Sequence, residues 1–317
     1  MQPAIETIGL GKSYGGVPVL KAVDLCVPRG EVFALLGPNG SGKTTTVRIL
    51  CTLLRADHGT ARVAGLDVTT QYHAVRRRIS LAGQHTALDD RQTGAENLRM
   101  MARLAGLSRA DAGRRADRLL ARFDLTGAAD RYVVTYSGGM RRRLDLAAAL
   151  VAESEVVFLD EPTTGLDPRS RQELWQVVAD LAEEGVTVLL TTQYLEEADR
   201  LADRIALLDG GRVVAEGTAA ELKRRVGDER LLLTMTDPAS HAEARRRLGD
   251  RVTADEPQRL TLAVATDGSA PQLRRLLDEA DPQGRGISRF EVRAATLDDV
   301  FLALTGVTHR ETETADV

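Results

Sequence analysis

The N-terminal part of the chain changes from a strand-like to a helix-like pattern of hydrophobic positions. Short apolar or alternating runs at Val17–Val27 and Glu31–Leu36 are bounded by glycine and proline, with a turn predicted at residues 28–30. From Lys43 to Leu54 the apolar side chains fall at helical spacing instead. The pattern therefore predicts two strands followed by a helix.

The middle of the chain is first helical and then alternates. Residues Thr93–Leu150 are rich in Ala, Leu and Arg, which is typical of helices. Strands are then predicted at Val156–Leu159 and Val186–Leu190, helices near Ser170–Glu184 and Glu196–Ala202, and a hairpin at Ile205–Leu208 and Arg212–Ala215. Such alternation is typical of an α/β core with a mainly parallel sheet. The helical block at about 85–150 is expected to be a subdomain inserted into that core.

The pattern restarts after residues 227–228. Strands are predicted at Arg230–Thr236, Arg259–Ala265 and Ile287–Arg293, and helices at Ala239–Leu248, Pro271–Ala280 and Leu297–Leu304. These elements are enough for a small α+β domain. We expect an N-terminal domain at 1–228, a C-terminal accessory domain at 229–306, and a disordered tail at 307–317, whose apolar content is too low to pack.

Composition narrows the class of protein. The 317 residues carry 42 Lys+Arg against 46 Asp+Glu, a net charge of -4, which argues against a protein that mainly binds nucleic acid. We find neither an apolar run long enough for a membrane-spanning helix nor a secretion signal, so we expect a soluble chain. Two cysteines in apolar segments favour a reducing cytoplasm over a disulfide framework. Basic residues are nearly all Arg, which suggests a GC-rich genome.

The strongest local signal lies between the second strand and the first helix. There the chain carries a complete G-x-x-x-x-G-K-[ST] sequence: Gly37, Pro38, Asn39, Gly40, Ser41, Gly42, Lys43 and Thr44, followed by Thr45. Glycines let successive N–H groups wrap an anion at a helix N-terminus. We expect Lys43 to lie against the β- and γ-phosphates of a nucleotide and the Thr44 hydroxyl to ligate Mg²⁺.

A pair of acids follows a fully apolar run. Asp160 and Glu161 come directly after Val156–Leu159, so a buried strand would deliver both at its carboxyl edge, where α/β sheets bind ligands. Asp160 suits the Mg²⁺ shell, and Glu161 suits a general base that polarises the attacking water.

Further segments carry a family resemblance. Residues 136–141, Tyr-Ser-Gly-Gly-Met-Arg, resemble the LSGGQ signature of ATP-binding cassette (ABC) ATPases, and Gln84 resembles the glutamine of their Q-loop. Residues 164–167, Thr-Gly-Leu-Asp, resemble their D-loop, and Tyr14 resembles their adenine-stacking aromatic. The resemblance covers residues 4 to about 225, and it implies a P-loop NTPase fold with ATP and Mg²⁺ as cofactors.

The resemblance also implies the residue roles. Beyond the loop at 37–45, residues in contact with ATP would be Tyr14, Gln84, Ser137, Gly138, Gly139, Met140 and Asp167. The metal would be held by Thr44, Gln84 and Asp160, and catalysis would rest on Glu161 and Gln193. For Tyr14, a core aromatic is the alternative interpretation.

One chain cannot easily present the signature turn and the phosphate loop to the same nucleotide. Ser137 can cap the helix that follows, and two glycines let backbone N–H groups approach a phosphate. In the resembling family the two motifs face each other across a head-to-tail dimer that holds two ATP molecules. Since this chain has one of each, the resemblance implies a homodimer or a pairing with a second cassette.

Two positions depart from the family pattern. Met140 stands where the signature usually has Gln, and Gln193 stands where most members carry a switch histidine. Gln193 can hydrogen-bond a phosphate or water but cannot shuttle a proton. The run Thr191-Thr192-Gln193-Tyr194 resembles the drug-exporter branch, which favours a working ATPase over a non-hydrolysing ATP-dependent switch. The run Arg141–Arg143 is expected to form a solvated helix face.

The C-terminal part narrows the expected function. Residues 296–306 resemble the closing motif of daunorubicin-resistance-type exporter cassettes, and Leu297, Val300, Phe301 and Leu304 make one helical stripe that would pack in its own domain. The resemblance implies a translocase: an ATPase at the cytoplasmic face of the membrane of an actinobacterial-type cell, docked on a separate six-helix permease, powering efflux of a drug or antibiotic. Alternatives are a lipid or polysaccharide exporter and a soluble, non-transport ABC ATPase.

Overall fold

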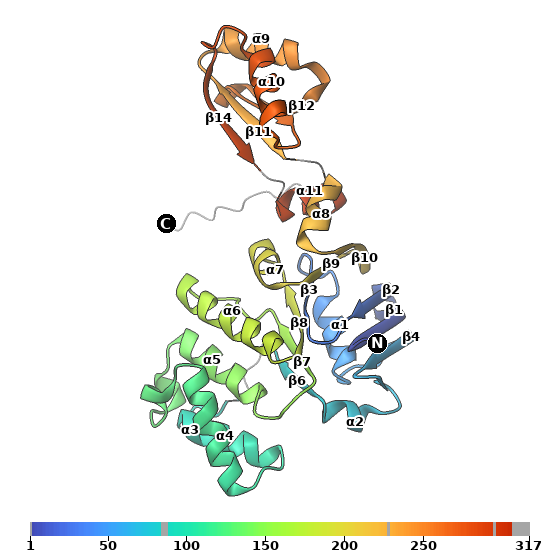
Figure 1. The fold of residues 1–317 in the computed structure, drawn as a ribbon. Coiled ribbons are helices and arrows are strands. Elements are labelled where there is room, and N and C mark those ends of the chain that lie inside the picture. The colour runs from blue at the N-terminus through green and yellow to red at the C-terminus, as the bar shows by residue number, and fades with distance from the viewer. Residues whose placement is uncertain (1, 84–87, 227–228, 294–295, 306–317) are drawn as a thin grey trace. The chain divides into compact units, whose positions relative to one another are not determined.

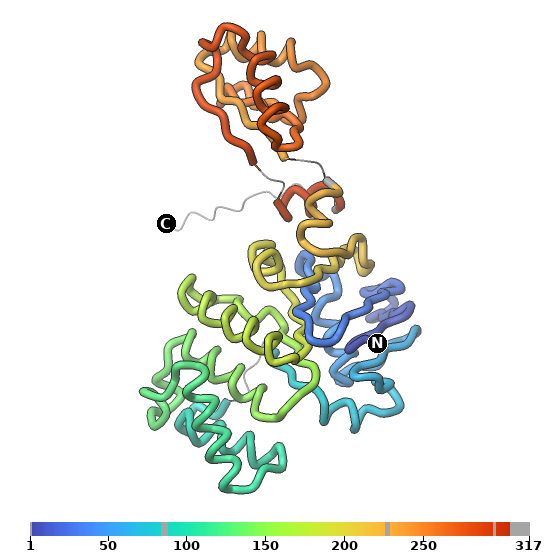
Figure 2. The backbone as a smooth tube through the Cα atoms, viewed as in Figure 1, coloured from blue at the N-terminus to red at the C-terminus, as the bar shows by residue number. Residues whose placement is uncertain are grey.

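The chain divides into two compact units, Met1–Ala219 and Ala220–Val317. The computed structural model describes residues 2–83, 88–226, 229–293 and 296–305, which Figures 1 and 2 trace in colour from the N-terminus to the C-terminus. The boundary between the units falls in helix α8 (Ala219–Val226), just before the point where the sequence pattern restarts. No helix in the described ranges is both long and apolar enough to cross a bilayer.

A six-stranded sheet forms the centre of the first unit (Figure 1). Its order is β10-β9-β3-β8-β7-β6, and its strands are β3 (Val32–Leu36), β6 (Ile79–Ala82), β7 (Val156–Asp160), β8 (Thr187–Thr192), β9 (Arg204–Asp209) and β10 (Arg212–Gly217). Neighbouring strands are parallel except β9 and β10. Every residue of β3, β7 and β8 is buried, as expected for parallel strands covered on both faces. The predicted mainly parallel sheet is therefore confirmed.

A second, antiparallel sheet shares the core of this unit. Its order is β2-β1-β4-β5, with β1 (Ile5–Tyr14), β2 (Val17–Val27), β4 (His58–Val63) and β5 (Leu66–Asp67). Leu10, Leu25 and Val63 from this sheet join Phe33 and Phe158 from the six-stranded sheet in one buried cluster. The sequence pattern identified only β2 of these four strands.

Helices flank the parallel sheet and form the block predicted between Thr93 and Leu150. The flanking helices are α1 (Lys43–Leu50), α2 (Tyr72–Arg76), α6 (Pro168–Glu183) and α7 (Leu195–Leu201). The block contains α3 (Gly94–Leu104), α4 (Arg109–Arg122) and α5 (Gly138–Ala149), with two short 3₁₀ turns, Thr126–Ala128 and Val133–Thr135, between α4 and α5. These helices gather on the β6 side of the sheet, and α5 packs against β6 (Figure 1).

The second unit holds a four-stranded antiparallel sheet under two helices. Its elements are β11 (Arg230–Met235), α9 (Pro238–Leu248), β12 (Val252–Glu256), β13 (Thr261–Ala265), α10 (Ala270–Ala280), β14 (Ile287–Arg293) and α11 (Leu297–Thr305), with 3₁₀ turns at Gly249–Arg251 and Pro257–Arg259. The order β12-β13-β11-β14 and the βαββαβ connectivity are those of a ferredoxin-like fold. Of these strands and α-helices, the sequence pattern missed only β12. In α11, Leu297, Val300 and Phe301 are buried, but Leu304 is 38% exposed.

Candidate nucleotide-binding site

The loop between β3 and α1 wraps around an open space at the carboxyl edge of the parallel sheet. Gly40 and Gly42 adopt φ angles of 82° and 110°, in the left-handed region that favours glycine. At Gly37 a Cβ atom would lie 2.2 Å from the carbonyl oxygen of Leu208, so only glycine fits there. Backbone geometry therefore accounts for three glycines of the predicted phosphate loop.

Lys43 is buried at the start of α1. Its side chain is 4% exposed, and Nζ donates hydrogen bonds to the carbonyl oxygens of Gly37 at 2.8 Å and Pro38 at 3.1 Å. The Glu161 carboxylate lies 3.5 Å from the same nitrogen. Burial lowers the pKa of Lys43, and the nearby Glu161 partly offsets this. The ammonium group therefore lies where a phosphate anion would relieve the cost of its burial.

Thr44, Asp160 and Thr191 form a hydrogen-bonded group beside this lysine. The Asp160 oxygen Oδ1 accepts from the Thr191 hydroxyl at 2.6 Å and from the Thr44 hydroxyl at 3.2 Å. A hydroxyl and a carboxylate are oxygen ligands of the kind that Mg²⁺ prefers. Thr44 and Asp160, predicted from separate motifs, are brought together by the fold and fit a magnesium ion bound along with phosphate oxygens.

Glu161 follows β7 in an unusual backbone conformation. Its φ angle is 49°, which is a strained value for a residue other than glycine. Its N–H is held by the carbonyl oxygen of Thr191 at 3.1 Å and by the hydroxyl at 3.0 Å. Its side chain is only 12% exposed and lies at the Lys43 ammonium. Strain of this kind persists where surrounding contacts impose it, and it often accompanies function.

A cavity of about 510 Å³ joins these residues. It is lined by Tyr14, Val19, Asn39, Gly40, Gly42, Lys43, Thr44, Thr45 and Glu161. Tyr14 is 47% exposed at the end of β1, so the core-aromatic interpretation is wrong and its ring is open to a base. The hydroxyl of Ser41 is buried without a hydrogen-bond partner, as expected of a loop that folds around a phosphate. The residues present therefore fit a nucleoside triphosphate.

The signature residues lie at the start of α5. Ser137 is its N-cap and accepts a hydrogen bond from the N–H of Met140 at 3.2 Å, which confirms the predicted capping role. Around Gly138 the space is open, whereas a Cβ atom at Gly139 would lie 2.4 Å from the Ser170 hydroxyl. A separate cavity is lined by Gly138, Arg141, Arg142, Glu161, Thr164, Gly165 and Leu166. None of the described signature residues lines the cavity of the phosphate loop.

Asp167 and Gln193 lie at the starts of two further helices. Asp167 is the N-cap of α6, and it accepts hydrogen bonds from the Ser170 N–H at 3.0 Å and the Ser170 hydroxyl at 2.7 Å, which lower its pKa. Gln193 is partly buried between the end of β8 and α7. Gln84 lies outside the described residues.

Two residues that the sequence pattern did not single out lie close to these motifs. Glu197 on α7 is 1% exposed, and it accepts a hydrogen bond from the indole of Trp175 at 3.3 Å. Burial raises its pKa. Arg142 on α5 is largely buried, and its guanidinium binds the carbonyl oxygens of Pro162 and Glu161. Neither could be recognised locally, because each lies in a charged run typical of a helix surface.

The predicted solvated face of Arg141–Arg143 is therefore wrong for two of its three residues. The Arg142 and Arg143 side chains are 12% and 14% exposed, against 32% for Arg141. Arg143 donates to the carbonyl oxygen of Phe123 at 3.2 Å and pairs with Glu173 at 3.1 Å. Three consecutive helical residues point in different directions, so two of them meet neighbouring segments.

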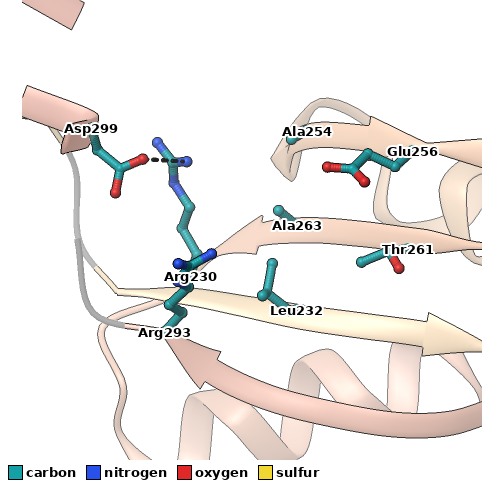
Figure 3. Close-up of a pocket in the computed structure, with 8 residues that line it drawn as sticks. All are labelled: Arg230, Leu232, Ala254, Glu256, Thr261, Ala263, Arg293 and Asp299. Atoms are coloured by element: carbon teal, nitrogen blue, oxygen red, sulfur yellow. Dashed lines mark hydrogen bonds and ion pairs between the residues drawn. The ribbon is translucent and has the colours of Figure 1, made fainter. Parts of the chain in front are cut away.

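The second unit has a cavity of its own, of about 140 Å³, on the open face of its sheet (Figure 3). Arg230 on β11 lies directly opposite Arg293 on β14, and Arg230 pairs with Asp299 of α11 at 3.4 Å. Leu232, Ala254 and Ala263 form the floor, and Glu256 and Thr261 lie at its far end (Figure 3).

Comparison with known proteins agrees with this geometry. Residues 20–164 match the ABC transporter family, and residues 217–305 match the C-terminal domain of DrrA1-3-like ATP-binding proteins. The daunorubicin/doxorubicin resistance ATP-binding protein DrrA of Streptomyces peucetius is 52% identical over 96% of this chain and 92% of its own length. The Nod factor export ATP-binding protein I of Ralstonia nicotianae is 37% identical over 96% and 94%.

A solved structure matches much of the chain. It is a dimeric ATP-binding cassette in a post-hydrolysis state with ADP and phosphate bound. Its sequence is 26% identical to this one, its TM-score is 0.62, and the match covers 68% of this chain and 98% of the cassette. The same fold thus holds nucleotide and forms a dimer in that protein.

Proposed function

Because the chain belongs to the ABC transporter ATP-binding proteins, with the C-terminal domain of their DrrA type, we propose that it powers export of an anthracycline-like drug through a separate membrane subunit. Like its family, it binds and hydrolyses ATP. The proposal rests on one combination. The residues that fit a nucleotide line one cavity at the carboxyl edge of the parallel sheet, and the chain is 52% identical to a daunorubicin/doxorubicin resistance protein along almost its whole length.

The residues at the carboxyl edge of the parallel sheet (the nucleotide edge) have separate roles in ATP binding and hydrolysis. Lys43 neutralises the terminal phosphates, and backbone N–H groups of the loop between β3 and α1 bind their oxygens. Thr44 and Asp160 hold Mg²⁺, which supplies charge neutralisation when it is bound with ATP. Glu161 accepts a proton from the attacking water, while Tyr14 stacks on adenine. Gln193 hydrogen-bonds the terminal phosphate or the attacking water, and Gln84 is the third residue that we assign to Mg²⁺.

Two cassettes form the working unit. Ser137, Gly138 and Gly139 do not line the cavity of the phosphate loop among the described residues, and a helix N-terminus favours an anion from outside. In our proposal they meet ATP held by a second cassette, either a copy of this chain or a related one. Asp167 and Met140 lie at the same interface. The dimeric solved cassette supports this arrangement.

The degree of identity favours a drug over a Nod factor as cargo. The resistance protein of Streptomyces peucetius is 52% identical to this chain, whereas the Nod factor exporter subunit is 37% identical over a similar length. We place the chain at the cytoplasmic face of the membrane, docked on a six-helix permease, in an actinobacterial-type cell. A lipid or polysaccharide exporter is the second candidate, since the Nod factor relative is also aligned along almost its whole length.

The test uses a tagged full-length chain expressed in its source cell. Glu161→Gln should bind ATP yet hydrolyse it at least about a hundredfold more slowly, so that dimers persist on a membrane partner during gentle solubilisation. We expect one copurifying polypeptide with several hydrophobic spans. Cells with the wild-type chain should accumulate less doxorubicin than cells with Glu161→Gln.

Other outcomes separate the alternatives. Equal doxorubicin accumulation with a copurifying membrane protein would move the cargo towards a lipid or saccharide. Recovery only from the soluble fraction would contradict transport and favour a soluble clamp. Unchanged hydrolysis by Glu161→Gln would contradict the role given to that residue, and hydrolysis absent from the wild-type chain would favour the non-hydrolysing switch.

A further inference from the structure

Arg142 joins three segments that the motifs place far apart in the sequence. From its Nε it donates to the carbonyl oxygen of Pro162 at 2.8 Å, and from Nη1 to that of Gly83 at 2.8 Å. Its Nη2 lies 3.5 Å from the carbonyl oxygen of Glu161. Asp145, one turn further along α5, holds the guanidinium at 3.3 Å. A planar guanidinium presents its donors in a fixed fork, which suits such a bridging role.

The Arg142 guanidinium lies mostly out of contact with solvent, so this arginine does not simply make the helix surface soluble. The Arg142 side chain is 12% exposed and Asp145 is 7% exposed. Burial lowers the pKa of Arg142, and Asp145, Asp160 and Glu197 act in the opposite direction. Desolvating a cation is costly unless paired charges and hydrogen bonds offset the cost. Here Asp145, Asp160 and Glu197 supply the opposing charge, and the carbonyl oxygens of Pro162 and Gly83 accept the hydrogen bonds.

The bridge holds the strained peptide at Glu161 from one side. Thr191 binds the N–H of Glu161 on the sheet side, and Arg142 faces its carbonyl oxygen from α5. The φ angle of 49° is thus imposed by contacts on both sides of the residue. With this backbone conformation the Glu161 carboxylate lies 3.5 Å from the Lys43 ammonium.

We propose that Arg142 is a positioning residue for ATP hydrolysis, which fixes the backbone of Glu161 against the end of β6 so that its carboxylate faces the nucleotide. This rests on the role proposed above for Glu161. Arg142 does not line the cavity of the phosphate loop, although it lines the separate cavity at Gly138 together with Glu161. Its effect should therefore appear in the rate of the chemical step and leave the affinity for ATP almost unchanged.

The test is ATP hydrolysis by the full-length chain with Arg142→Lys and Arg142→Ala. A lysine keeps the charge but cannot bridge separate carbonyls with one planar group. We expect kcat to fall about 10- to 100-fold in both variants, with KM and the Kd for ATP within about threefold of wild type. Methylguanidinium added to Arg142→Ala should restore part of the lost kcat.

Arg143→Lys is the matched control. Arg143 is the next residue on the same helix and is equally buried, but it contacts Phe123 and Glu173 instead of the catalytic turn. We expect Arg143→Lys to lower the melting temperature, but not to lower kcat while KM stays unchanged. A similar loss of kcat in Arg143→Lys would overturn the proposal, because it would point to a general packing effect on α5.

Glu161→Gln distinguishes failure of this inference from failure of its premise. If Glu161→Gln keeps wild-type turnover, the base is elsewhere and the proposal for Arg142 falls with it. If Glu161→Gln is slow while Arg142→Lys keeps wild-type kcat, only the positioning role is overturned. In the double variant, Arg142→Lys should lower the residual rate no further, since both changes act on one group; an additional loss equal to that of the single variant would overturn the proposal.

Discussion

The charges at the carboxyl edge of the parallel sheet and those on the open face of the C-terminal sheet are held differently. In the first, the Lys43 and Glu161 side chains are 4% and 12% exposed and lie 3.5 Å apart, and the Lys43 ammonium also donates to the carbonyl oxygen of Gly37. In the second, Arg230 and Asp299 are 32% and 28% exposed and pair at 3.4 Å (Figure 3). Arg293 lies directly opposite Arg230, a like-charge pairing that costs stability.

The two sets of charges differ in how far they are buried and in how closely they converge. At the nucleotide edge, Lys43 from the start of α1 lies beside Asp160 at the end of β7 and Glu161 just after it, and backbone strain at Glu161 accompanies this convergence. On the open sheet face, the charges remain hydrated, and an ion pair of this exposure contributes little stability. Burial and convergence of charges therefore distinguish the two sites more clearly than the presence of charges does.

The largest expected effect compares Lys43→Ala with Arg230→Ala. Both variants remove a cation that has a carboxylate partner. Lys43→Ala should lower ATP turnover by about a hundredfold or more, because the phosphates lose their buried positive partner. Arg230→Ala should keep turnover within about twofold of wild type. Phosphate release and ATP binding by the full chain check both, with a melting curve as the folding control; comparable losses would erase the distinction between the sites.

A smaller effect should separate two aspartates that both cap helices. Asp167 caps α6 next to the signature residue Gly139, and Asp237 caps α9 in the second unit. Asparagine caps a helix about as well as aspartate, so Asn at either position preserves the fold. We expect Asp167→Asn to lower turnover about tenfold through the proposed dimer interface and Asp237→Asn to leave it unchanged. Equal turnover in the two variants would contradict a role for Asp167 at that interface.

Sequence patterns predicted those parts of the molecule whose burial is decided locally. Strands β7 and β8 are continuous apolar runs, and the phosphate loop carries glycines where the backbone requires them. Strands β1 and β4 were not recognised, because they are stabilised by pairing with each other across a long sequence separation and β1 carries two glycines. Thr44 and Asp160 were assigned to one metal from two motifs, and the fold brings them together.

The site residues that were missed depend on distant backbone atoms. Arg142 lies in a run of three arginines, and nothing local shows that the carbonyl oxygens of Gly83 and Pro162 will receive its guanidinium. Glu197 follows another glutamate in a polar stretch, yet it is buried against Trp175 of α6. In both cases tertiary packing overrides the composition of the helix.

Glu197 gives a prediction about pH within the first unit. Burial raises its pKa, so the stabilising, protonated form is favoured at low pH and this contribution is lost as the pH rises through the folded-state pKa. Glu197→Gln should therefore gain stability relative to wild type as the pH increases. Trp175 is the only tryptophan and contacts Glu197, so its fluorescence reports unfolding in guanidinium directly. A stability difference that does not vary with pH would contradict a buried titrating carboxyl.

The smallest effect, and the opposite sign, is expected for Asp237 in the second unit. Its carboxylate accepts hydrogen bonds from the N–H groups of Ala239 and Ser240, both at 2.9 Å, and from the Ser240 hydroxyl at 2.8 Å. These bonds lower its pKa from the ordinary 3.8 to about 2. A depressed pKa means that the capping contribution is complete above the ordinary value and is lost as the pH falls towards the folded-state value.

Asp237→Ala should therefore weaken α9 at neutral pH but differ less from wild type under acid conditions. Hydrogen exchange of α9 amides in the full chain, compared between the two proteins at equal pH, measures this locally. We expect faster exchange in the variant at about pH 5 and a smaller ratio at about pH 3. Asp237→Asn keeps the cap without the charge, so its protection should stay near wild type and vary less with pH. A ratio for Asp237→Ala that is constant over this range would mean that capping geometry, and not ionisation, sets the stability of α9. Turnover of ATP should be the same in all three proteins, because this aspartate only stabilises the fold of the second unit.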